Sequence, residues 1–125
     1  MPASGFRGPK ELVKAGQWSM QGLKAAYQNE ASFRLEVYLF IILIPLAIWL
    51  AESSTQLLML LGSAWLVLLV EILNSAIEAV VDLICGDEQH ELAGRAKDMG
   101  SAAVFLATAL TLVTWAMVIY QNYLI

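Results

Sequence analysis

Long apolar runs separated by short polar stretches are the main pattern along the 125 residues of this chain. Three of these runs are long enough for spanning helices, because about 20 apolar residues cross the hydrocarbon core of a bilayer. We expect the spanning helices at residues 31–51, 56–85 and 99–120. The first contains Pro45, which a membrane helix tolerates. The pattern therefore predicts an all-α integral membrane protein.

The segment before the first apolar run has a different pattern. Residues 10–29 interleave apolar side chains with Lys10, Lys14 and Lys24 at helical spacing. That pattern is typical of an amphipathic helix lying on an anionic membrane surface, although a helix packed against its own protein would have it too. Residues 1–9 hold two prolines and two glycines and are predicted to be irregular.

Composition agrees with a membrane protein of one domain. Hydrophobic residues make up 59% of the chain, and the mean hydropathy is +0.67, both high for a soluble protein. The single cysteine, Cys85, excludes an intramolecular disulfide and a metal site of several cysteines. We interpret Cys85 as a small apolar residue near a helix end. No nucleic-acid partner is expected.

The distribution of basic residues predicts the orientation in the membrane. Four of them precede the first spanning helix, so the N-terminus is expected on the cytoplasmic side. The connection at residues 52–56 has no basic residue and is expected to face outward. The segment 86–98 holds Arg95 and Lys97 and is expected to face the cytoplasm.

The second predicted spanning helix carries polar side chains where a membrane helix is normally apolar. At 100° per residue, one narrow stripe holds Glu71, Asn74, Ser75, Glu78 and Asp82. An ionisable side chain in the membrane costs about 2.5–3.5 kcal/mol on insertion scales, so it usually marks a functional site. With a rise of about 1.5 Å per residue, Glu71 and Glu78 lie near the inner boundary of the bilayer. There a lipid headgroup and a water-soluble ligand can meet.

The cytoplasmic segment 86–98 combines acids with His90 and Lys97 and is expected to be helical from about Gln89. These charges suit a phosphorylated ligand with a divalent cation. The alternative is a solvated loop in which Glu91 and Arg95 form an i,i+4 pair.

Glu30, just before the first spanning helix, also has two interpretations. It stands four residues before Arg34 and can form an ion pair with it. It is also expected near the same boundary as Glu78, where two carboxylates and substrate phosphates would suit Mg²⁺.

Two segments resemble the prokaryotic diacylglycerol kinase family: EILNSAIEAVVD at residues 71–82 and HELAGRAKDMGSAAV at residues 90–104. The upstream GLKAAY at 22–27 and NEASFR at 29–34 are similar to the same family, so the resemblance covers nearly the whole chain. The form it resembles most is the Gram-negative enzyme of the bacterial inner membrane. The undecaprenol kinases of Gram-positive bacteria share much of the pattern.

The resemblance implies a homotrimer with composite active sites between protomers, each protomer having a surface helix and three spanning helices. It implies that Glu71 is the general base on the lipid hydroxyl and that Asn74 lies beside the reacting groups. Glu30 and Glu78 would hold the Mg²⁺ that bridges the ATP phosphates.

The resemblance also implies two sets of contacts. The ATP contacts would be Trp18, Glu30, Glu78, Glu88, Gln89, His90, Lys97 and Asp98. The contacts with diacylglycerol would be Ala15, Gly16, Ser19, Lys24, Ala25, Ala26, Tyr27, Ser32, Phe33, Arg34, Glu36, Trp49, Glu71 and Ser101.

The chain departs from the family pattern in three places. Trp18 replaces a tyrosine, and the loop at residues 85–89 is one residue longer. Glu11 stands where the family has an arginine that contacts ATP, so Lys10 or Lys14 would take over that contact.

The function expected from the resemblance is ATP- and Mg²⁺-dependent phosphorylation of diacylglycerol to phosphatidic acid, for phospholipid recycling. In a dry environment Glu71 would be a strong acceptor for the hydroxyl proton. A polyprenol kinase would use the same residues on another lipid. An oligomeric ion or proton carrier would also place acids in the membrane, but it has no need of the Lys/His/acid cluster beside them.

Overall fold

The computed structural model describes residues 8–125, and these residues are helical apart from short connections. The elements are α1 (Pro9–Asn29), α2 (Ala31–Leu50), α3 (Ser54–Cys85) and α4 (Glu91–Ile119), which continues into the π-helical turn η1 (Tyr120–Leu124). The predicted all-α class is confirmed for this part of the chain. The predicted irregular segment 1–9 lies mostly outside the described residues.

Three of these helices are long and apolar enough to cross a membrane. They are Ala31–Leu50, Ser54–Cys85 and the continuous helical stretch Glu91–Leu124. α2 is continuous through Pro45. The third long helix begins well before residue 99, so only residues 86–90 connect it to α3. The protein is therefore an integral membrane protein of three apolar helices.

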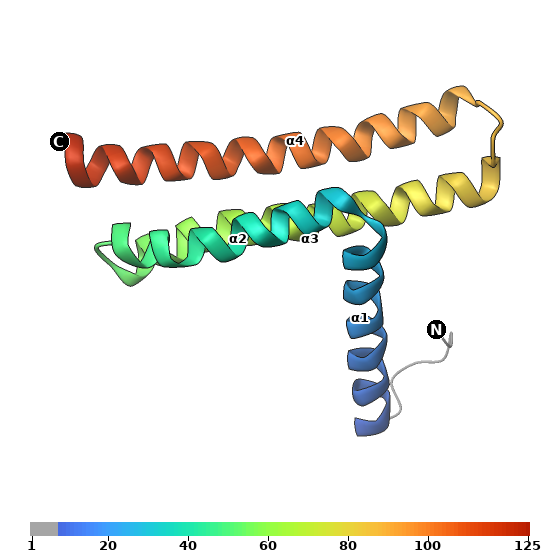
Figure 1. The fold of residues 1–125 in the computed structure, drawn as a ribbon, viewed down its shortest axis with the longest axis horizontal. Coiled ribbons are helices and arrows are strands. Elements are labelled where there is room, and N and C mark those ends of the chain that lie inside the picture. Colours follow the sequence, from blue (N-terminus) through green and yellow to red (C-terminus); the bar gives the residue numbers. More distant parts are fainter. Residues whose placement is uncertain (1–7) are drawn as a thin grey trace.

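Figure 1 shows how the four helices are arranged. α2, α3 and α4 run side by side, and α1 extends crosswise from the start of α2. The second part of α3 and the first part of α4 continue beyond the start of α2. Ala26 is the only buried residue of α1, so most of that helix does not pack on its own chain.

Local sequence signals explain where the helices begin and end. Pro9 takes the first position of α1, where its missing N–H costs nothing. Ser53 caps α3, because its side chain accepts a hydrogen bond from the Gln56 N–H at 3.1 Å. Gly86 ends α3 at φ 56, a left-handed conformation that glycine adopts without strain, and its N–H donates to the Asp82 carbonyl at 2.9 Å.

The core lies toward the end of the bundle that is distant from α1. Its buried members are Ala47, Leu50, Leu60 and Val118. Two side chains of α4 also donate to main-chain carbonyls of α3: Thr111 to Ser63 at 2.9 Å and Trp115 to Leu60 at 3.2 Å. Such hydrogen bonds between membrane helices help to fix α4 against α3.

Polar side chains close this same end of the bundle. The Asn122 amide donates to the Leu50 carbonyl at 2.9 Å and to Gln56 Oε1 at 3.0 Å, while Gln56 Nε2 donates to Asn122 Oδ1 at 3.0 Å. The end of α2, the start of α3 and η1 are joined in this way. We call Asn122, Gln56 and the Leu50 carbonyl the end clasp.

Large apolar side chains are exposed along all three long helices. Among them are Trp65 at 61%, Phe105 at 72% and Leu106 at 67% exposure. A water-soluble monomer rarely leaves so much apolar surface uncovered. In a bilayer these faces can contact acyl chains or another membrane helix.

Candidate active site

Four carboxylates gather where α1, α2 and α3 meet. Glu71 faces into the chain from α3 and is only 7% exposed. The carboxylates of Glu36, Glu78 and Glu30 lie near enough to repel that of Glu71 electrostatically. We call these four residues the acidic cluster. Both predicted metal ligands thus lie within electrostatic range of the predicted base, and so does Glu36, which the resemblance implied only as a lipid contact.

Glu30 occupies the junction between α1 and α2. Its backbone is extended, its N–H donates to the Ala26 carbonyl at 2.9 Å, and its carbonyl accepts from the Arg34 N–H at 3.1 Å. The Arg34 guanidinium instead closes the end of α1 by donating to the carbonyls of Tyr27 at 2.7 Å and Gln28 at 3.1 Å. Within residues 8–125 no ion pair joins Glu30 to Arg34. The half-buried Glu30 therefore has no ion-pair partner among the described residues.

Two polar contacts organise the second half of α3. The Asn74 amide donates to Glu78 Oε1 at 3.3 Å. One turn beyond Glu78, Asp82 binds the ammonium of Lys97 on α4, with an N–O distance of 2.7 Å. The sequence pattern placed Asp82 on the polar stripe but did not predict this ion pair. The sequence did contain one indication of this ion pair, because Asp82 and Lys97 lie on either side of the short α3–α4 connection.

Predicted ATP contacts line a hollow beside this ion pair. Glu88, Gln89, His90 and Lys97 surround a space of about 310 Å³ together with Asp82 and Gly94. This volume is at the low end for ligand pockets. Four predicted ATP contacts from the connection and α4 are thus near one another and next to the acidic stripe of α3.

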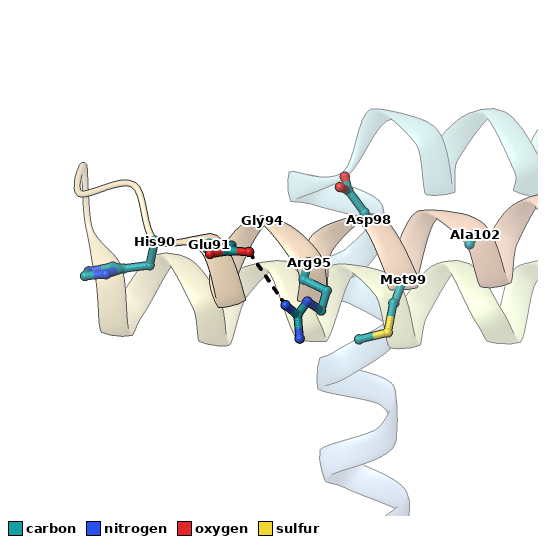
Figure 2. A pocket seen from close by; sticks show the side chains of 7 residues that line it. All are labelled: His90, Glu91, Gly94, Arg95, Asp98, Met99 and Ala102. Atoms are coloured by element: carbon teal, nitrogen blue, oxygen red, sulfur yellow. Dashed lines mark ion pairs between the residues drawn. The ribbon is translucent and has the colours of Figure 1, made fainter.

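A second hollow adjoins the first on α4 and shares His90 and Gly94 with it (Figure 2). Here Glu91 and Arg95 form the predicted i,i+4 pair at 3.8 Å. Asp98, another predicted ATP contact, extends to the other side of α4 from Arg95 in this view. The structure therefore does not place all predicted ATP contacts around one space.

The aromatic residues among the predicted substrate contacts lie in three different parts of the structure. Trp18 is partly buried on α1, whose packing on the bundle lies mainly at its other end. Around the α1–α2 junction, Phe33 is buried and the hydroxyls of Tyr27 and Tyr38 are hydrogen-bonded, which raises the pKa of Tyr27. Trp49 stacks on Tyr123 near the end clasp, at the opposite end of α2.

The other predicted lipid contacts are small or exposed. Ser19 Oγ donates to the Ala15 carbonyl at 2.9 Å within α1. Ala26 is buried at the junction, and the remaining ones are exposed: Gly16, Lys24, Ala25, Ser32 and Ser101.

An apolar groove leads away from the acidic cluster between α2 and α4. Ala64 and Val67 of α3 line it together with Leu39, Thr108 and neighbouring side chains, and Glu36 lies at its border. A carboxylate beside an apolar groove is the arrangement that an amphiphilic substrate needs.

Comparisons with known proteins now give the family. The family model described as "Prokaryotic diacylglycerol kinase" matches residues 17–119. The diacylglycerol kinase of Escherichia coli K12 is 46% identical over 121 residues, covering 97% of this chain and 98% of that protein. The chain belongs to the prokaryotic diacylglycerol kinase family. The diacylglycerol kinase of Haemophilus influenzae Rd is 45% identical over 113 residues, covering 90% of this chain and 95% of that protein. The diacylglycerol kinase of Pseudomonas aeruginosa PAO1 is 43% identical over 118 residues, covering 94% of this chain and 95% of that protein.

Membership of the prokaryotic diacylglycerol kinase family confirms the resemblance predicted from residues 71–82 and 90–104. It also confirms that the chain belongs to a family of kinases. The family match begins at residue 17, so Glu11 and the lysines that would replace an arginine lie outside it.

Proposed function

We propose that this protein transfers the γ-phosphoryl group of ATP to the free hydroxyl of diacylglycerol, giving phosphatidic acid for phospholipid recycling. The observation that carries the proposal is the acidic cluster around the buried Glu71. Along α3, Glu71 comes after Ala64 and Val67, which line the apolar groove, and before Asp82, which lines the polar hollow containing Lys97. A lipid alcohol needs the first environment and a triphosphate the second. Family membership supports the same reaction.

The arrangement of the helices supports a site at the cytoplasmic leaflet of the bacterial inner membrane. If α2–α4 cross the bilayer, the crosswise α1 lies along its surface (Figure 1). α1 exposes Lys10, Lys14 and Lys24 as well as large apolar side chains such as Leu12 and Met20, which suits an anionic surface. By the positive-inside rule, these lysines support a cytoplasmic N-terminus.

The carboxylates of this site suit a divalent cation that also binds the phosphates of ATP. Glu30 and Glu78 would be its protein ligands, since Arg34 is engaged with main-chain carbonyls and Lys97 with Asp82. No three His, Cys, Asp or Glu side chains among residues 8–125 are close enough together to hold a metal ion, so the carboxylates of the acidic cluster lie too far apart for a site of three protein ligands. One or two carboxylates plus phosphate oxygens is a common ligand set for Mg²⁺. When bound, Mg²⁺ would neutralise phosphate charge and orient the γ-phosphoryl group.

The reaction then assigns a role to each group of this chain. Glu71 accepts the proton of the lipid hydroxyl as its oxygen attacks the γ-phosphorus, and the bond to the β-phosphate oxygen breaks to release ADP. A positioned base contributes about 10²–10⁴-fold to the rate. The ammonium of Lys97, held by Asp82, counters negative charge on the phosphates, which phosphoryl transfer requires.

A single chain does not surround both substrates, which supports a homotrimer with shared sites. Neither Trp18 nor Asp98 lines the hollow that contains Lys97, and apolar faces of the long helices are uncovered. A second protomer packed on these faces would enclose the site and supply such contacts from outside the chain.

A lipid panel tests the proposed reaction. The purified protein in mixed micelles is given labelled ATP and Mg²⁺ with diacylglycerol, with undecaprenol or with no added lipid. We expect labelled phosphatidic acid and little turnover without lipid. Faster labelling of undecaprenol would instead identify a polyprenol kinase. ATP consumption independent of lipid, or none at all, would contradict a lipid kinase and favour an ion carrier or another role.

A further inference from the structure

Asn74 has an unusual environment on the polar face of α3. Its amide nitrogen donates to Glu78 Oε1 at 3.3 Å. Its Oδ1 is fully buried and accepts no hydrogen bond from the described residues. A buried carbonyl oxygen without a donor is normally costly, so the surroundings of Asn74 must hold the side chain in this orientation.

Gly100 of α4 is the residue that faces this oxygen. A Cβ atom added to Gly100 would overlap Asn74 Oδ1 and would come within 3.3 Å of Asn74 Cγ. The Cα–H bond that stands in its place points toward the oxygen, as in a weak C–H···O contact. At every other glycine within residues 8–125, an added Cβ would meet nothing within 4 Å. The close approach is therefore specific to this point of the α3–α4 interface.

We infer that Gly100 is a positioning residue for Glu78: its missing side chain leaves the space in which Asn74 is held with its amide turned to that carboxylate. The inference rests on the proposed function, in which Glu78 is a metal ligand. A hydrogen bond on one carboxylate oxygen restrains the Glu78 side chain and leaves the other oxygen available, so that Glu78 could serve as a metal ligand through it. Ligating carboxylates commonly have such a partner, whose loss costs about 10–100-fold in metal affinity or activity.

The geometry also predicts what a methyl group at Gly100 would do. The atoms it would strike belong to the end of the Asn74 side chain and not to the backbone. Asn74 can therefore rotate away while α3 and α4 stay packed. Gly100→Ala is expected to fold, and to lose the hydrogen bond to Glu78.

The test measures metal binding directly. Mn²⁺ replaces Mg²⁺, and its binding to the full-length protein with a non-hydrolysable ATP analogue is followed by electron paramagnetic resonance. We expect Gly100→Ala to weaken Mn²⁺ binding about 10-fold or more and to raise the Mg²⁺ concentration needed for half-maximal activity in parallel. Thermal unfolding followed by circular dichroism shows whether the variant folds.

Two further variants make the test specific. Gly62→Ala is the same replacement inside α3, at a position with open space, and it should leave Mn²⁺ binding unchanged. Asn74→Ala removes the oxygen that the methyl group would strike, so adding Gly100→Ala to it should weaken Mn²⁺ binding no further. Additive effects, or a folded Gly100→Ala variant with unchanged Mn²⁺ binding, would overturn the inference. Failure of the proposed function is distinguishable, because the unmodified protein would then phosphorylate no lipid.

Discussion

At the scale of single residues, Glu71 is the one charged residue that is buried among residues 8–125. Its side chain is 7% exposed and lies among three other carboxylates. Burying a charge without a partner is costly, and such a cost is usually tolerated at functional sites. The helical periodicity of the sequence was sufficient to place Glu71, Asn74 and Glu78 on one face. It could not predict that Arg34 turns to main-chain carbonyls, because that choice depends on the angle between α1 and α2.

At the scale of residues, we predict how the Mg²⁺ requirement changes when Glu78 is substituted. Glu78→Gln keeps the size and the hydrogen-bonding partner of the side chain but removes the charge that a divalent cation needs. The variant should require about 10-fold more Mg²⁺ for half-maximal activity, or lose activity. A Mg²⁺ titration of the rate measures this. Glu52→Gln makes the same change at the exposed opposite end of the bundle and serves as the control. An unchanged titration for Glu78→Gln would remove this residue from the metal site.

At the scale of helices, the end clasp and the acidic cluster lie near opposite ends of α2. The core and the side-chain hydrogen bonds from α4 to α3 gather near the clasp. The site end is held by the Asp82–Lys97 ion pair and by the small Gly100 at the α3–α4 interface. The hydrophobic runs indicated where the helices are. They could not indicate that Asn122, from the end of the chain, would bind the last turn of α2, since that contact spans 72 residues.

The clasp gives a stability prediction. Asn122→Ala removes the donor to the Leu50 carbonyl and both contacts with Gln56. The net value of a hydrogen bond is about 0.5–1.5 kcal/mol, so the loss of three should lower the free energy of unfolding by about 1.5–4.5 kcal/mol. Denaturation followed by circular dichroism measures it. Gln121→Ala, which loses only a 3.4 Å contact with Gln56, should change it much less. Equal effects of the two substitutions would contradict a clasp centred on Asn122.

At the scale of the whole molecule, the crosswise α1 decides how the chain relates to the membrane (Figure 1). The sequence predicted a helix at residues 10–29 and offered a position on the membrane surface as one of two interpretations. It could not decide between them, because the direction of α1 depends on the extended Glu30 and on the Arg34 contacts. The exposed apolar faces of α2–α4 are explained by lipid or by other protomers. The number of protomers cannot be read from one chain's periodicity.

The orientation of the molecule has its own prediction. In a Cys85→Ser background, Ser54→Cys and Asp87→Cys each place one exposed thiol at opposite ends of α3. A membrane-impermeant maleimide added to spheroplasts should label Ser54→Cys and leave Asp87→Cys unlabelled, and permeabilised cells should label both. Labelling of Asp87→Cys in intact spheroplasts would place the acidic cluster on the wrong side for cytoplasmic ATP.

The central claim is that Glu71 takes the proton of the lipid hydroxyl at the boundary between membrane and cytoplasm. The most direct measurement is the steady-state rate of lipid phosphorylation by Glu71→Gln over a range of ATP concentrations in mixed micelles. The account predicts a fall in kcat of about 10²–10⁴-fold, with the KM for ATP near the unmodified value. Weaker ATP binding with a full kcat would contradict the claim.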